Sequence, residues 1–249
     1  GVSKTTTAVS LAATAASKGH RTLLVDLDPR AAATSWVDVQ PTEAGLDVSA
    51  ILGNVDPDGW AADLAVPVDE QRWPAGLHVL PSTRLASLIE MGQAPHQEVR
   101  LRRSLVDAPF DVVVIDCPNR QGGPLTLSAL TAADLVVYAA VPNADGREGV
   151  AGGRESVRRH RANLTALGAA SRPVEAGIVL GSVSTQVVPR IERHTVEQLE
   201  AAHGDLLLRP FVPRRTVVQQ AREASDWYGR YQAGAAVADA YSELFEVIY

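Results

Sequence analysis

The sequence has a single cysteine, only two lysines and no excess of positive charge, and these shortages exclude several classes of protein. With one cysteine, Cys117, among 249 residues, a disulfide framework and a cysteine-ligated metal or iron–sulfur site within one chain are excluded. No apolar run approaches the roughly 20 residues that a membrane-spanning helix needs, and no signal peptide is recognisable. We therefore expect a cytoplasmic protein without a membrane partner.

The charge balance is acidic. The chain has 23 Lys and Arg against 29 Asp and Glu, a net charge of −6, which excludes a uniformly basic nucleic-acid binder but leaves room for a local basic patch. Almost all the basic residues are arginines, because Lys4 and Lys18 are the only lysines. The shortage of lysine makes Lys4, at the head of an alanine-rich segment, conspicuous.

Helical patterns alternate with short apolar runs that are typical of buried strands. This alternation predicts an α/β fold with a mostly parallel, twisted sheet and helices on both faces, in one domain over 1–249. Within it, the Pro- and Gly-rich stretch 41–76 is expected to be an irregular insertion. Helices are expected at 4–18, 84–92, 99–108, 125–133, 149–168, within 187–204 and at 236–248, and strands at 21–28, 76–82, 110–118, 134–142, 175–183 and within 206–214.

The opening stretch GVSKTT has the composition of the second half of a phosphate-binding loop. Backbone N–H groups at a helix N-terminus attract phosphate, a lysine adds charge, and a hydroxyl can ligate Mg²⁺. The common pattern is G-x-x-x-x-G-K-[ST], and here Ser3 stands where its last glycine is expected. Taken alone, a Lys-Thr pair at a helix start is more often a coincidence than a site.

Aspartates at the ends of two predicted strands favour a phosphate site. Asp26 and Asp28 end one apolar run, and Asp116 ends another. Parallel strands end at the same edge of a sheet, where open α/β folds bind ligands, and a carboxylate at such a tip can hold Mg²⁺ through water. Each aspartate alone could cap a helix or a turn. Three of them together with Lys4 and Thr5 predict a nucleotide site.

Several blocks of the sequence resemble the ParA family of partition ATPases, within the ParA/MinD group of deviant P-loop proteins. Residues 1–35 resemble the family's K-G-G-V-G-K-T-T-T, a helix, and then L-L-V-D-L-D-P-Q-G-N-A-T-S. Similar segments follow at 77–90 around Leu-Pro-Ser, at 110–130 (Y-D-x-x-x-I-D-C-P-P), at 141–150 (P-x-x-x-x-x-x-E-G) and at 211–229 (I-P-R-x-x-x-x-x-E-A). The resemblance covers nearly the whole chain.

The resemblance implies an ATPase that uses ATP and Mg²⁺. Such a protein dimerises on ATP, binds DNA without sequence preference, and segregates or positions a plasmid, a chromosome or a protein cargo at the nucleoid. A ParB-like or cargo adaptor protein would stimulate its hydrolysis. The family's first strand, and the signature lysine that reaches the partner's nucleotide, would precede Gly1, and a chain without them is expected to fold poorly and hydrolyse ATP weakly.

The resemblance also implies roles for single residues. Lys4 would lie on the β- and γ-phosphate oxygens, the Thr5 hydroxyl would ligate Mg²⁺, and Thr6 would contact the α-phosphate. Backbone amides would cradle the phosphates at Gly1, Val2, Ser3, Lys4 and Thr5.

The strand-end and C-terminal positions receive roles in the same way. Asp26 and Asp116 would lie in the outer shell of Mg²⁺, and Asp28 would orient the attacking water. Pro213 and Arg214 would border the adenine.

Arginines outside the loop are candidates for contacts with DNA phosphates, which require charge but no base readout. The resemblance points to Arg190, Arg193, Arg215 and Arg222. The alternative is a solvated face paired with Glu155, Glu192 and Glu197. That alternative is favoured for a stripe on one predicted helical face, formed by Arg154, Arg158 and Arg161.

Some positions depart from the family pattern. Ser3 replaces a glycine, which is tolerable only if its φ is negative or the loop adjusts. Arg30, Asn119 and Asn143 replace Gln, Pro and Gln, and serines stand where an acidic residue is expected near the adenine.

Two other functions stay open on the sequence. One is a metabolic P-loop enzyme of the dethiobiotin synthetase type, which would need a polar substrate pocket in 41–76. The other is a non-catalytic scaffold gated by nucleotide.

Overall fold

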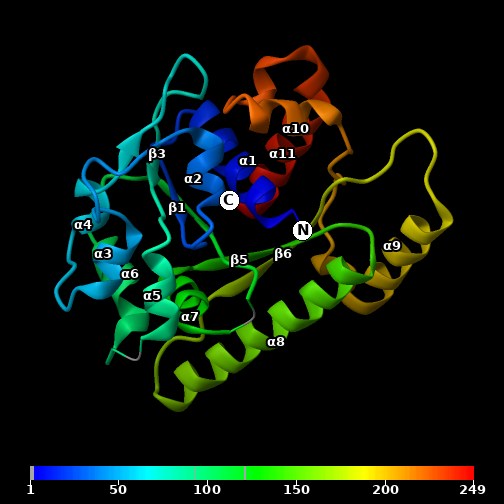
Figure 1. Cartoon of the computed structure of the whole chain (residues 1–249). Coiled ribbons are helices and arrows are strands. Elements are labelled where there is room, and N and C mark those ends of the chain that lie inside the picture. Colours follow the sequence, from blue (N-terminus) through cyan, green and yellow to red (C-terminus); the bar gives the residue numbers. More distant parts are fainter. Residues whose placement is uncertain (1–2, 93, 121) are drawn as a thin grey trace.

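The computed structural model describes residues 3–92, 94–120 and 122–249, so Gly1 and Val2 of the predicted loop lie outside it. Helix α1 (Lys4–Ser17) runs through the centre of the molecule (Figure 1). It is buried from Thr7 to Ala16, because its Ala, Ser and Thr side chains let other elements approach from every side. The helix predicted at 4–18 is confirmed.

The strands form two sheets within the described part of the chain. The larger has the order β2-β3-β1-β4 and the smaller pairs β5 with β6. All pairs are parallel except β2 with β3, so the predicted mostly parallel sheet is confirmed. The bounds are β1 (Thr22–Asp26), β2 (Val66–Pro67), β3 (Leu77–Leu80), β4 (Val112–Asp116), β5 (Leu135–Ala140) and β6 (Val174–Leu180).

The two sheets meet across α1 rather than through hydrogen bonds. No ladder joins β4 to β5 among the described residues. The α1 alanines pack in one hydrophobic cluster with Leu24 and Val79 of the larger sheet and Val179 of the smaller one. Val113 of β4 and Leu135 of β5 keep 37% and 43% of their surface exposed, which is high for apolar residues in sheet strands.

Helices cover both faces of these sheets. α11 (Ala235–Ile248) packs on α1, and α8 (Ala144–Ala166) packs on β5 (Figure 1). The remaining helices are α2 (Ala32–Val37), α3 (Val48–Gly53), α4 (Trp60–Asp63), α5 (Ala86–Met91), α6 (Arg100–Ser104), α7 (Pro124–Ala132), α9 (Arg190–His203) and α10 (Thr216–Glu223).

Some predicted elements differ from the structure. α8 begins five residues before the predicted start at 149, because the Asn143 side chain accepts a hydrogen bond from the Gly146 N–H and caps it there. The strand predicted within 206–214 is wrong: this segment makes only isolated bridges, Leu207 with Ile178 and Pro213 with Val183. The stretch 41–76 contains α3, α4 and β2 between irregular connections.

Candidate nucleotide site

The phosphate loop leads into α1 through Ser3, which caps the helix with φ of 66° and ψ of 15°. The φ of Ser3 is positive, so the first of the two expected conditions is not met, and the loop keeps the left-handed conformation that favours glycine. The Ser3 Oγ donates to the Ala140 carbonyl oxygen at 3.4 Å, which ties the loop to the end of β5. Thr5 and Thr6 follow in the first turn, both half-buried.

Lys4 reaches from the first turn of α1 to the segment after β4. Its Nζ donates to the Asn119 Oδ1 at 2.6 Å. Burial lowers the pKa of Lys4, and the negative charges of Asp116 and Asp28 oppose that shift. Asn119 was noted only as a departure from the family's proline, and nothing in its local sequence pattern indicates that it meets Lys4.

Asp26 ends β1, and both of its carboxylate oxygens accept hydrogen bonds. Its Oδ1 accepts from the Asp28 N–H at 3.0 Å, and its Oδ2 accepts from the N–H and the hydroxyl of Thr34 at 2.9 and 2.8 Å. Burial raises the pKa of Asp26, and the Thr34 bonds act in the opposite direction. The Thr34 hydroxyl in turn accepts from the Ser82 N–H, so Asp26 also fixes the first turn of α2 and the end of β3.

Asp116 ends β4 directly opposite Asp26 in the strand register. Its side chain is buried, and neither carboxylate oxygen has a hydrogen-bond partner in the described structure. Burial, reinforced by the Asp26 charge, raises the pKa of Asp116 to about 7, while the nearby Thr5 hydroxyl and Lys4 lower it. A buried carboxylate without a partner beside a hydroxyl offers oxygen atoms that fit a hydrated Mg²⁺ ion, and the lysine beside them adds positive charge for phosphate.

Asp28 lies just beyond β1, half-buried, in the turn that precedes α2. Its Oδ1 accepts from the Arg30 N–H at 2.9 Å, and its carbonyl oxygen accepts from the Ala31 N–H at 2.7 Å. Ala31 has a φ of 52° at the position where the family pattern has glycine. The turn is therefore a second place where a side chain occupies the left-handed region.

The segment 181–184 connects the loop with the predicted adenine border. Gly181 lies against Ser3, since a Cβ added to it would be 3.2 Å from the Ser3 Oγ. Two residues further on, the Val183 carbonyl oxygen accepts from the Arg214 N–H at 2.8 Å, and Val183 bridges to Pro213. The structure therefore brings Pro213 and Arg214 to the same edge as the loop.

Arg214 is held there by a buried carboxylate. Its guanidinium group forms a 2.9 Å ion pair with Glu192, and its Nε donates to the Ser182 carbonyl oxygen at 3.2 Å. The same Glu192 accepts from the N–H and hydroxyl of Ser184. Glu192 was expected only as a counter-charge on a solvated face, and its spacing in the sequence does not indicate this role.

The candidate DNA-binding arginines lie on separate supports. Arg190 and Arg193 are exposed in the first turn of α9. Arg215 precedes α10 and donates to the Thr185 hydroxyl at 3.0 Å, whereas the Arg222 guanidinium lies 5.8 Å from the centre of the Trp36 ring. Of these two arginines, Arg215 is the one whose contact lies near the start of α9, because Thr185 precedes that helix.

Two of the three arginines in the α8 stripe form ion pairs, whereas the third, Arg161, donates to the Ser171 hydroxyl at 3.0 Å. Arg158 and Arg159 form ion pairs with Glu155, the latter at 2.9 Å. Arg154 instead pairs with Glu175 at 2.7 Å and contacts His203. Arg158 and Arg159 therefore share one carboxylate, whereas Arg154 has its own.

The described residues also bear on metal binding and on membrane crossing. They contain no group of three or more His, Cys, Asp and Glu side chains arranged to hold a metal. Mg²⁺ commonly keeps several waters and uses one or two protein groups with substrate phosphates, so a single hydroxyl with outer carboxylates suits it. None of the described helices combines the length and apolar character that crossing a membrane requires.

A parallel sheet that ends in paired aspartates beside a lysine at a helix N-terminus defines a P-loop nucleoside triphosphatase. Residues 1–164 match the family model described as an AAA domain. The chain is 33% identical over 250 residues to the chromosome-partitioning ATPase Soj of Thermus thermophilus, covering 100% of this chain and 91% of that protein. The chain belongs to the ParA/Soj family of partition ATPases and is a P-loop ATPase.

Solved structures agree with this fold. Cobyrinic acid a,c-diamide synthase from Mycobacterium smegmatis, with bound ADP and magnesium, superposes with a TM-score of 0.73 at 29% identity, covering 99% of this chain and 88% of that one. An ATP complex of a McdA variant from Cyanothece gives a TM-score of 0.81 over 99% of this chain and 92% of that one. At 18% identity the second likeness shows the fold alone.

Replacing Ser3 by glycine is expected to raise the free energy of unfolding by about 0.5–1 kcal/mol, because it removes a Cβ from the left-handed region. Chemical denaturation measures the change. Ser17→Gly, at an exposed helical position of α1, is the matched control and is expected to lower stability by about 0.5–1 kcal/mol. A loss of stability in Ser3→Gly would contradict the backbone assignment.

The buried Asp116 predicts a pH dependence of stability in the protein free of metal and nucleotide. Its folded pKa of about 7 lies above the usual value of 3.8, so between these values the folded state holds a proton that the unfolded state releases. The free energy of unfolding should therefore fall as pH rises from about 4 to about 7. In Asp116→Asn this component disappears, and urea titrations with equal pH slopes for the two proteins would refute it.

Proposed function

We propose that this ATPase dimerises on ATP, binds DNA without sequence preference, and segregates or positions a plasmid, a chromosome or a protein cargo. A ParB-like or cargo adaptor protein would stimulate its hydrolysis, and DNA binding would place it at the nucleoid. The observation that carries the nucleotide part is Asp116, buried without a partner opposite Asp26 and beside Lys4. The partition role follows from the similarity to Soj along the whole chain.

The residues that would hold ATP·Mg²⁺ come from three segments. Backbone amides of the loop and the Lys4 ammonium would bind the phosphates, with Thr6 on the α-phosphate. The Thr5 hydroxyl would ligate Mg²⁺, with Asp26 and Asp116 on its waters, and the ion would neutralise phosphate charge. Gly1 and Val2 keep their predicted loop role outside the described residues.

Two further roles concern the water and the base. Asp28 would orient the attacking water, because it is half-buried and its charge lies close enough to Asp116 to raise the pKa of Asp116. Pro213 and Arg214 would border the adenine, because the segment 181–184 carries them to the edge where Ser3 lies.

The open edges of β4 and β5 support the predicted strand ahead of the phosphate loop. α1 packs on both sheets, and Ser3 contacts the end of β5, so a strand leading into the loop would enter between them. Pairing with both edges would satisfy their backbone groups and cover Val113 and Leu135. We infer that such a strand makes one continuous sheet.

A metabolic ATP-dependent enzyme is the second candidate, because one solved relative is named as a synthase. Two surface grooves, of about 400 and about 670 Å³, lie on α8 and α9, whereas this candidate would need a polar substrate pocket in 41–76. An activity that depends on neither DNA nor an adaptor would favour this candidate.

DNA retention that requires ATP is the test of the proposed function. Affinity should be high with ATP, low with ADP, and should fall steeply with salt. The double variant Arg190→Ala, Arg193→Ala should make the negative slope of log K against log salt shallower by about 1.8, since each lost phosphate contact removes about 0.9 from its magnitude. Arg158→Ala, whose charge is paired with Glu155, is the control and should leave the slope unchanged. Equal retention with ADP and ATP would sink the proposal.

Adding a strand tests the inferred sheet. A chain with a β-forming segment and Lys-Gly ahead of Gly1 should unfold at a higher temperature and turn over ATP faster. A chain with a Gly/Ser segment of equal length controls for the added residues. If both extended chains melt and hydrolyse ATP alike, no strand pairs between β4 and β5.

A further inference from the structure

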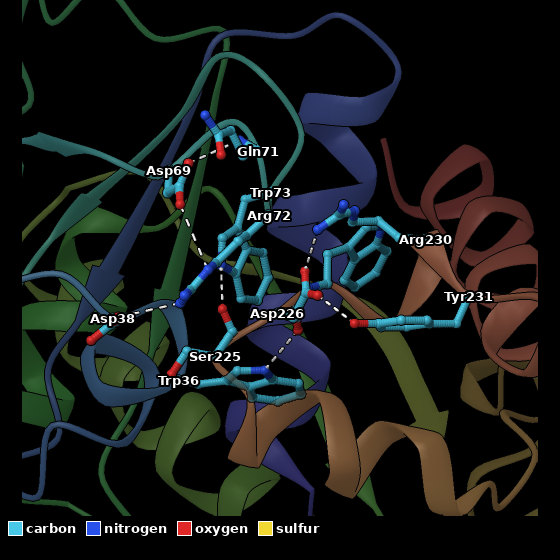
Figure 2. A network of polar contacts seen from close by, with 11 residues as sticks. Trp36, Asp38, Asp69, Gln71, Arg72, Trp73, Ser225, Asp226, Arg230 and Tyr231 are labelled. Atoms are coloured by element: carbon cyan, nitrogen blue, oxygen red, sulfur yellow. Dashed lines mark hydrogen bonds and ion pairs between the residues drawn. The ribbon is translucent and has the colours of Figure 1, made fainter.

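Trp36 connects the nucleotide edge with the C-terminal part of the chain (Figure 2). Its ring is buried, and its Nε1 donates to the Asp226 carbonyl oxygen at 3.4 Å. On the ring face lies the Arg222 guanidinium group, 5.8 Å from the ring centre. Trp36 therefore contacts Asp226, 190 positions away in the sequence, and Arg222, which is itself a candidate DNA-binding arginine.

The other end of α2 is fixed to the nucleotide edge. Thr34, two residues before Trp36, donates hydrogen bonds to Asp26 from both its N–H and its hydroxyl. α2 is six residues long, and Ala31 and Asp38 at its ends have φ values of 52° and 57°. Because neither end has a locally favoured conformation, tertiary contacts hold α2, and a shift at Asp26 would move Trp36 with it.

The C-terminal side of the contact is itself a connected unit. The Asp226 carboxylate accepts from the Arg230 guanidinium and the Tyr231 hydroxyl, as Figure 2 shows. A second indole, Trp73, donates to the Ser225 carbonyl oxygen at 3.2 Å and meets the Trp36 ring edge-on, with 6.4 Å between centroids. The segment 225–231 thus rests on two indoles, one of which belongs to α2.

The stretch of chain that contains Asp226 begins at the predicted adenine border. Pro213 and Arg214 lie beside Val183, Arg215 precedes α10, and Arg222 lies in the last turn of that helix. The stretch 213–231 is therefore anchored at the predicted adenine border and at Trp36. Both anchors lie on elements that contact the nucleotide edge.

We propose that Trp36 is a positioning residue that transmits the state of the nucleotide site to the segment 213–231 and so sets the geometry of Arg215 and Arg222. This inference rests on the proposed function, because its output is DNA binding that depends on ATP. Asp26, Thr34 and Trp36 form the input side of the connection, and the unit around Asp226 forms the output side.

The test uses Trp36→Phe in the full-length protein, which keeps an aromatic ring but removes the indole N–H. Trp60→Phe is the matched control, since Trp60 lies half-buried on α4 in a different hydrophobic cluster. Amide hydrogen exchange over 225–231 should change when ATP·Mg²⁺ is added to the wild type and to Trp60→Phe, but not to Trp36→Phe. The ratio of DNA affinity with ATP to that with ADP should fall at least about fivefold in Trp36→Phe, with ATP affinity retained.

The outcomes separate the two proposals. Absence of ATP-dependent DNA binding in the wild type refutes the proposed function, while the exchange measurement still tests the connection. An exchange response that is missing in the wild type, or equal in Trp36→Phe, overturns the inference. Should Trp36→Phe not fold, Tyr231→Phe replaces it, because this ring is 43% exposed and loses only its bond to Asp226. For Tyr231→Phe, the inference requires that ATP·Mg²⁺ change the amide exchange over 225–231 less than it does in the wild type. An equal change overturns the inference.

Discussion

The alignment of two buried carboxylates at the ends of neighbouring strands is the constraint on which the rest of the site depends. The register of β1 and β4 places Asp26 opposite Asp116, where two negative charges repel each other in a poorly solvated edge. Hydrogen bonds from Asp28 and Thr34 stabilise the charge of Asp26. Asp116 is left with a raised pKa and no hydrogen-bond partner in the described structure.

The neighbouring elements follow from that constraint. α1 is built from small residues, so it lies buried against both sheets and delivers Lys4 and Thr5 to the carboxylates. Thr34 is bound to Asp26, so α2 is positioned by the same carboxylate and carries Trp36 to the C-terminal segment. Satisfying one buried charge therefore also determines how distant parts of the chain are connected.

Much of the fold and of the site could be predicted from local patterns. The apolar runs that end at Asp26 and Asp116 are strands, and the alanine-rich run after Ser3 is a helix, because period and composition are local properties. Short elements such as α2 and α10 were missed, since six or eight residues carry too little periodicity. The run within 206–214 has the composition of a strand, yet it finds only isolated bridging partners.

What the sequence by itself determined is the chemistry available at the sheet edge: one lysine and two threonines at a helix start, and aspartates at strand tips. Only the tertiary structure decided how these groups are used. In the described structure Asp116 has no hydrogen-bond partner, Lys4 donates a hydrogen bond to Asn119, and Arg214 forms an ion pair with Glu192. Ser3 adopts a backbone conformation that glycine prefers. The reason is physical: hydrogen-bond partners, desolvation and backbone strain depend on residues that lie close in space but far apart along the chain.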